Sequence, residues 1–152
     1  MIATLEKPRL PVFRKPQQPA TQHAPQHAPG QAEAMVDYLR RCIITGRASA
    51  ERFHAVFLDA RRTYLGDTSL GMGLDFALTL RMRDLFSRAL SIGASGLIIA
   101  HNHPSGDCRP SACDIASTHR LKEVAGALDI ELIDHLIITE RSAYSMRAGG
   151  DL

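Results

Sequence analysis

Residues 96–114 read GLIIAHNHPSGDCRPSACD, and they are the most informative part of the sequence about the fold. Its first five residues form a continuous apolar run of strand length, which is typical of a strand buried on both faces. A polar loop with proline and glycine follows, and a helix is expected from about residue 111 to residue 128. Functional groups in open α/β sheets gather beyond the carboxyl ends of strands, so we expect a site in this strand–loop–helix unit.

The segments on both sides of this unit alternate between helical and strand-like patterns. The expected elements are a helix over 35–43, strands over 53–58 and 63–70, a short strand over 74–80, a helix over 85–92, the central strand and helix, a strand over 130–139 and an edge strand over 143–147. This order predicts an α/β fold, in which a mixed β-sheet is sandwiched by helices.

The first thirty residues differ in composition from the rest of the chain. They hold six of the eight prolines, a repeated Gln-His-Ala-Pro and few large apolar side chains. Such a segment has too little apolar surface to offset the entropy of ordering. We therefore expect a disordered Pro/Gln-rich tail over residues 1–30 and one folded domain over 31–152.

The net charge of +2 is divided unevenly, with +3 on the tail and −1 on the domain. Proteins that track nucleic-acid phosphates usually concentrate basic residues on one face, so the charge of the domain does not support nucleic-acid binding. The sequence has no run of about 18 apolar residues and no secretory signal. Its three cysteines form an odd, sparse set that fits a reducing compartment, so we expect a cytoplasmic protein outside the membrane.

Two histidines separated by one residue end the central apolar strand. In an extended chain, His101 and His103 point to the same side, so both imidazoles can reach one ion. Pro104 and Gly106 then turn the chain, which lets the following helix return Asp114 towards the histidines. Two histidines and one carboxylate leave a fourth tetrahedral position for water, as in catalytic zinc sites.

Each half of this pattern also has an ordinary structural interpretation. An isolated His-x-His pair is more often a pair of core histidines satisfied by hydrogen bonds. Ser111 and Asp114 suit the N-cap and N3 positions of the next helix, as an Asp variant of the capping box. The combination favours a metal site, because a capping serine does not explain two histidines at the end of a buried strand.

The spacing H-x-H, seven residues, S, two residues, D resembles the metal motif of the JAB/MPN (JAMM) metalloprotease family. Each term of the motif is matched, by His101, His103, Ser111 and Asp114. Three sequence segments are similar to those of the RadC-like branch of the family. They are HNHPSG at 101–106, FLD at 57–59 and DHLII at 134–138. The resemblance covers roughly residues 33–148 and implies a JAB/MPN, cytidine-deaminase-like architecture.

The resemblance implies a role for each matched residue. His101, His103 and Asp114 would be the ligands of Zn²⁺, and Ser111 would hydrogen-bond the oxyanion of a tetrahedral intermediate. A glutamate at the start of the first core strand would be the general base that takes a proton from the metal-bound water, and Glu51 holds that position. Spacing alone does not select Glu51, whose ordinary interpretation is a solvated residue that caps a strand.

The chain departs from the RadC-like pattern at two places. Relatives usually have H-P-R-E where this chain has RMRD at 81–84, and they often have a glutamate where this chain has Thr68. The neighbouring Asp67 would face the opposite side of its strand. These differences concern substrate binding more than the metal.

Other residues near the motif have open or minor roles. The resemblance needs neither Cys108 nor Cys113 as a ligand, and on a helix Cys113 points about 100° away from Asp114. His135 either forms a hydrogen bond to a metal ligand and so orients it, or is a strand residue whose own hydrogen bonds are satisfied without any role at the metal.

The function implied is a zinc-dependent metallohydrolase that cleaves amide bonds in a protein or peptide, as a peptidase or isopeptidase does. The alternative is a non-catalytic, metal-stabilised interaction module associated with DNA repair or mobile elements. A zinc nucleoside deaminase fits poorly, because its H-x-E and P-C-x-x-C signature would require a glutamate at His103 and a cysteine at Ser111. A homodimer is a possible assembly, although no exposed stripe demands one.

Overall fold

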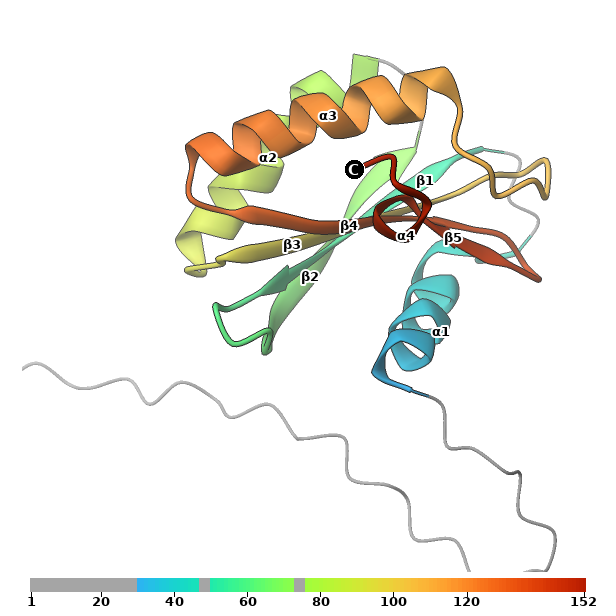
Figure 1. Cartoon of the computed structure of the whole chain (residues 1–152), viewed down its shortest axis with the longest axis horizontal. Coiled ribbons are helices and arrows are strands. Elements are labelled where there is room, and N and C mark those ends of the chain that lie inside the picture. Colours follow the sequence, from blue (N-terminus) through green and yellow to red (C-terminus); the bar gives the residue numbers. More distant parts are fainter. Residues whose placement is uncertain (1–29, 47–49, 73–75) are drawn as a thin grey trace, which may run out of the picture.

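The computed structural model describes residues 30–46, 50–72 and 76–152. A mixed five-stranded sheet lies between helices, which confirms the expected α/β sandwich (Figure 1). The elements in chain order are α1 (Gln31–Ile43), β1 (Arg52–Leu58), β2 (Tyr64–Met72), α2 (Phe76–Ser91), β3 (Gly96–Asn102), α3 (Ala112–Ala127), β4 (Glu131–Ile138), β5 (Ala143–Ser145) and α4 (Met146–Gly149). The expected tail lies, apart from Gly30, outside the described residues.

The strands follow the order β2-β1-β3-β4-β5 across the sheet. Only β3 and β4 run parallel, and α3 connects them, whereas the other neighbours are antiparallel. Every residue of β3 is buried, as its continuous apolar run predicts. Strand β3 is the central strand of the sheet. His101 and Asn102 lie at its carboxyl end, close to the start of α3.

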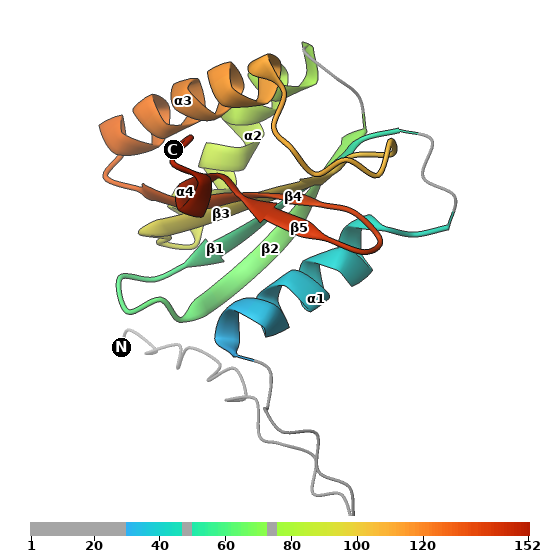
Figure 2. The same ribbon diagram turned by 45° about the vertical axis from the view of Figure 1, so that its right-hand side comes forward.

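Helices cover both faces of the sheet, with α2 and α3 on one face and α1 on the other (Figure 2). Strand β1 contributes to both cores because its side chains alternate between the faces. Ala55 and Phe57 pack with α2 and α3, and Val56 and Leu58 pack with α1. In the described part of the chain, no helix has the length and apolar character needed to cross a membrane.

Two expected strands differ from the structure. Residues 76–80 open α2 rather than forming a strand, and residues 73–75 lie outside the described part. Their short apolar–polar alternation resembles a strand, but they run into a segment rich in the strong helix formers Ala, Leu, Met and Arg. The edge strand ends at Ser145 instead of Arg147, because the Ser145 hydroxyl accepts a hydrogen bond from the Ala148 N–H and caps α4.

Candidate metal centre

The end of β3 and the first turn of α3 bring His101, His103 and Asp114 together, and their ligand atoms all lie within 4.8 Å of one another. The two Nε2 atoms are 3.0 Å apart. Asp114 Oδ1 lies 3.3 Å from His101 Nε2, and Asp114 Oδ2 lies 3.4 Å from His103 Nε2. Gly106, with a φ of 83°, makes the turn in the loop between the two elements.

These separations suit a tetrahedral ion. Ligand atoms about 2.0–2.1 Å from a zinc ion stand roughly 3.3 Å apart along the edges of a tetrahedron. The three observed separations fall close to that edge length. The cluster is also enclosed, because the side chains of His101, His103 and Asp114 are 0%, 12% and 9% exposed. This buried His/Asp cluster can bind a metal ion.

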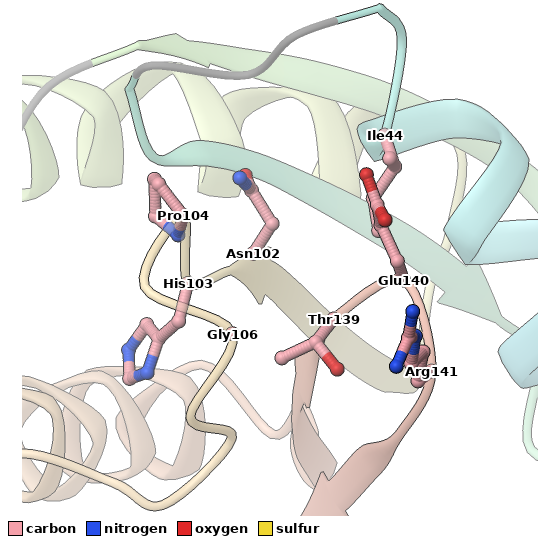
Figure 3. Close-up of a pocket in the computed structure, with 8 residues that line it drawn as sticks. All are labelled: Ile44, Asn102, His103, Pro104, Gly106, Thr139, Glu140 and Arg141. Atoms are coloured by element: carbon pink, nitrogen blue, oxygen red, sulfur yellow. The ribbon is translucent and has the colours of Figure 1, made fainter.

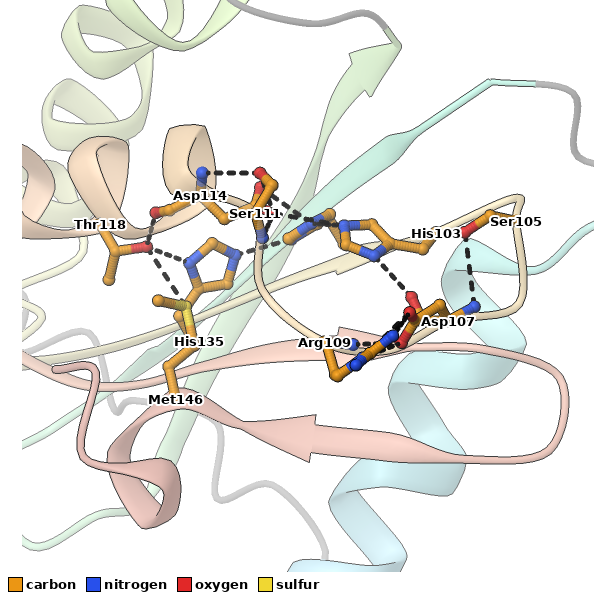
Figure 4. Close-up of polar contacts among 10 residues, drawn as sticks. His103, Ser105, Asp107, Arg109, Ser111, Asp114, Thr118, His135 and Met146 are labelled. Atoms are coloured by element: carbon orange, nitrogen blue, oxygen red, sulfur yellow. Dashed lines mark hydrogen bonds and ion pairs between the residues drawn. The ribbon is translucent and has the colours of Figure 1, made fainter.

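A chain of hydrogen bonds fixes the tautomer of His101. Figure 4 shows three of its members, Asp114, Thr118 and His135. The Thr118 hydroxyl donates to the backbone oxygen of Asp114 over 2.6 Å, so its only proton is used there. His135 Nδ1, 2.6 Å from Thr118 Oγ1, must therefore carry the proton and donate to it. Burial lowers the pKa of His135 to about 3, so this ring is neutral and its Nε2 is an acceptor. His101 Nδ1, 2.8 Å from that Nε2, is then the donor.

The tautomer of His103 is fixed in the same way. Its Nδ1 lies 2.7 Å from the backbone oxygen of Asp107, which can only accept a hydrogen bond. When both rings are neutral, the Nε2 atoms of His101 and His103 therefore carry no proton, and their lone pairs face each other. Two such lone pairs 3.0 Å apart repel each other unless a cation lies between them. Histidines that bind a metal through one ring nitrogen typically donate a hydrogen bond of this kind from the other ring nitrogen.

Asp114 is both a ligand candidate and part of a helix cap. Its Oδ2 accepts hydrogen bonds from the Ser111 N–H and hydroxyl over 2.7 and 2.6 Å, while Ser111 Oγ accepts the Asp114 N–H. Burial opposes the charge on Asp114, but the nearby imidazole of His101 and the hydrogen bonds from Ser111 outweigh it and hold the pKa of Asp114 well below its usual range. The capping box and the metal cluster therefore share one carboxylate.

Ser111 is thus placed beside the cluster with its proton directed to Asp114. The expected hydrogen bond from Ser111 to an oxyanion stays a prediction, since it would require the hydroxyl to turn away from this carboxylate.

Glu51 lies just before β1, next to the strand that ends in the histidines. Phe53 pairs with His101 across the sheet, and their rings stack with centroids 4.8 Å apart. Glu51 is two residues before Phe53, so in extended chain its side chain points to the same face. Glu51 Oε2 is buried and has no hydrogen-bond partner among the described residues. Such an atom is rare in folded proteins and is a candidate for a functional group.

A pocket of about 300 Å³ opens beside His103 (Figure 3). Loop residues around the centre and the turn between β4 and β5 line it: Ile44, Asn102, His103, Pro104, Gly106, Thr139, Glu140 and Arg141. The charged residues in this described lining are Glu140 and Arg141, in addition to the imidazole of His103. The hollow gives a bound molecule access to His103.

Several other residues from the sequence analysis lie away from the centre. Asp67 pairs with Val56 on the α1 face, as expected, so it does not replace an acid at Thr68. Cys113 is exposed, and the cluster of His101, His103 and Asp114 does not include it. Residues 81–84 lie within α2.

The sequence analysis missed Thr118, which completes the hydrogen-bond chain behind His101. Its position four residues after Asp114 on one helical face was a usable signal.

Comparison with known proteins gives a consistent result. The family model of the RadC-like JAB domain matches residues 30–151. A UPF0758 protein of Paraburkholderia xenovorans is 40% identical over 118 residues, which is 78% of this chain and 46% of the relative. UPF0758 proteins of Halorhodospira halophila and Thermotoga maritima are 40% and 38% identical over 68% and 64% of this chain, and over 46% and 44% of their own. The chain therefore spans about half the length of these relatives.

Proposed function

The chain belongs to the RadC-like JAB domain family, and from this membership we propose that it is a zinc-dependent hydrolase that cleaves an amide bond in a protein or peptide. The observation that carries the proposal is the pair of Nε2 atoms of His101 and His103, which face each other at 3.0 Å beside the Asp114 carboxylate. The donor set of two imidazoles and one carboxylate suits zinc and leaves a position open.

The residues of the chain would divide the chemistry among them. A zinc ion held by His101, His103 and Asp114 would supply a water of pKa about 7 and polarise the carbonyl of the substrate. Glu51, whose buried Oε2 has no hydrogen-bond partner in the described part of the chain, would accept the proton of the attacking water and pass it to the leaving amine. Ser111 would donate its hydroxyl proton to the developing oxyanion.

The pocket beside His103 would receive the substrate. The turn between β4 and β5 places Glu140 and Arg141 in its lining, and these can pair with charged groups of a peptide on either side of the cleaved bond. Among the described residues, the lining contains no cluster of basic side chains of the kind that nucleic-acid phosphates require. A peptide or protein substrate is therefore the proposal that this pocket supports.

The test combines metal analysis with turnover. Protein purified without chelators should hold zinc at the centre formed by His101, His103 and Asp114, called the first centre below. The His103→Ala variant should lose that zinc. The His119→Ala variant, changed at an exposed position of α3, should keep it. The zinc-loaded chain should hydrolyse internally quenched peptides of randomised sequence. The Glu51→Gln variant should keep its zinc and lose roughly 10²–10⁴-fold in rate, while Glu123→Gln on α3 should match the wild type.

Two results would reject the proposal. The first is zinc binding no tighter than micromolar, or binding that His103→Ala does not change. The second is a rate of peptide hydrolysis that Glu51→Gln leaves unaltered. Tight zinc binding without any turnover, with unfolding of the ligand variants, would favour the alternative of a metal-stabilised interaction module.

A further inference from the structure

A second group of metal-ligating side chains lies on the opposite face of the sheet, under α1. Cys42 from α1, His54 from β1 and Asp67 from β2 place a thiol, an imidazole nitrogen and a carboxylate oxygen within 4.8 Å of one another. His54 directly follows Phe53, which stacks on His101, and it points the other way because successive strand residues alternate. The two clusters therefore lie on opposite sides of β1.

The imidazole of His54 lacks a satisfactory partner in this cluster. His54 is 8% exposed, and its buried Nε2 makes no hydrogen bond among the described residues. Nevertheless this atom lies 3.2 Å from Asp67 Oδ2. A short separation without hydrogen-bond geometry is the arrangement of two ligand atoms around a common ion, and 3.2 Å is close to the edge of about 3.3 Å in a zinc tetrahedron.

The surroundings hold the carboxylate in place for a ligand role. The Tyr38 hydroxyl donates a hydrogen bond to Asp67, and this bond raises the pKa of Tyr38. Burial opposes the charge on Asp67, but the hydrogen bond from Tyr38 and the nearby imidazole of His54 outweigh it and lower the pKa of Asp67, so the carboxylate is ionised. The Tyr38 hydrogen bond goes to Oδ2, the oxygen that also approaches His54 Nε2. A carboxylate oxygen has two lone pairs, so Oδ2 can accept this hydrogen bond and still bind an ion.

We propose that Cys42, His54 and Asp67 form a second site for a zinc-class divalent ion, which ties α1 to β1 and β2. A thiolate and a carboxylate balance the two charges of such an ion, and a thiolate–imidazole–carboxylate set selects zinc or cobalt over magnesium or calcium. Cys42 and Asp67 are partly exposed, so an ion can enter. The proposal does not depend on the hydrolase activity.

Cobalt(II) tests this site, because a cobalt–thiolate bond gives a sulfur-to-metal charge-transfer band in the near ultraviolet. The first centre contains no cysteine, so the band reports on the second site alone. The reduced, metal-free 152-residue chain should bind two equivalents of cobalt and show the band. Asp114→Asn should remove one equivalent and keep the band, and Cys42→Ser should remove the other equivalent together with the band.

Control variants separate the possible outcomes. Cys108→Ser and Cys113→Ser should leave the band unchanged. Asp67→Asn, which can still accept the Tyr38 hydrogen bond, should stay folded by circular dichroism and weaken cobalt binding at this site at least tenfold, even if Cys42→Ser fails to fold. The proposal is overturned if the wild type binds one equivalent without the band, or if Cys108→Ser or Cys113→Ser removes the band.

Discussion

At the scale of single residues, the atoms behind the imidazoles decide what the first centre can bind. The carbonyl of Asp107 and the pair formed by Thr118 and His135 place a proton on the outer nitrogen of His103 and of His101. Each ring then turns a lone pair towards Asp114. An arrangement with the protons on the inner nitrogens would bring two N–H groups together and could not hold a cation.

Thr118 provides a test of this chain of hydrogen bonds. Thr118→Val keeps the shape of the side chain and removes the oxygen that receives the His135 proton. Metal affinity at the first centre should fall by about 10–100-fold, the usual effect of losing a supporting hydrogen bond. Competition with a chromophoric chelator measures the affinity, and Thr118→Ser, which keeps the hydroxyl, is the matched control. Equal affinities for the two variants would contradict the tautomer assignment.

At the scale of elements, the first turn of α3 has two tasks, since Ser111 caps the helix through the same carboxylate that faces the histidines. Ser111→Ala should lower the free energy of unfolding of the metal-free protein by about 1 kcal/mol, because the N–H of Asp114 loses its acceptor. Urea denaturation in chelator measures the change. Ser117→Ala, within the same helix, should cost less, and equal losses would show that the cap contributes nothing.

The elements that local sequence determines were predictable. The apolar run of β3 and the cap of α3 are properties of neighbouring residues, so their structure and the convergence of His101, His103 and Asp114 followed from the pattern. The start of α2 was mistaken for a strand because a few alternating residues carry little information beside the rest of the helix.

The parts that spacing could not predict depend on pairing between distant strands. The register of β1 on β3 pairs Phe53, two residues after Glu51, with His101. Spacing along the chain could not select Glu51, whose role as general base stays a prediction from the family resemblance. Cys42, His54 and Asp67 come from three elements, and their meeting depends on how α1 packs on the sheet. Local periodicity carries no information about such contacts.

At the scale of the whole molecule, the buried His135 makes the stability of the metal-free protein depend on pH. The folded protein keeps this ring neutral down to pH of about 3, whereas the unfolded chain protonates it below about 6.5. The unfolded state then binds more protons, so stability is full above about pH 6.5 and falls as the pH drops, by up to about 1.4 kcal/mol per unit from this group.

Urea denaturation in chelator between pH 7 and pH 5 measures this slope. His135→Gln has no titrating ring at this position and should show a shallower loss, although it is less stable at pH 7. Identical slopes would show that His135 is protonated in the folded state.

The alternation of β1 has a consequence for how this chain tolerates changes in length. Phe53 faces one cluster of ligands and His54 the other, so losing one residue within the strand would reverse both at once. A deletion there would withdraw the aromatic support of His101 and bury an imidazole against α2 and α3. We therefore expect insertions and deletions to be tolerated in the hairpin between β1 and β2 rather than within β1. An added residue in that hairpin leaves the side chains of Phe53 and His54 on their present faces of the sheet.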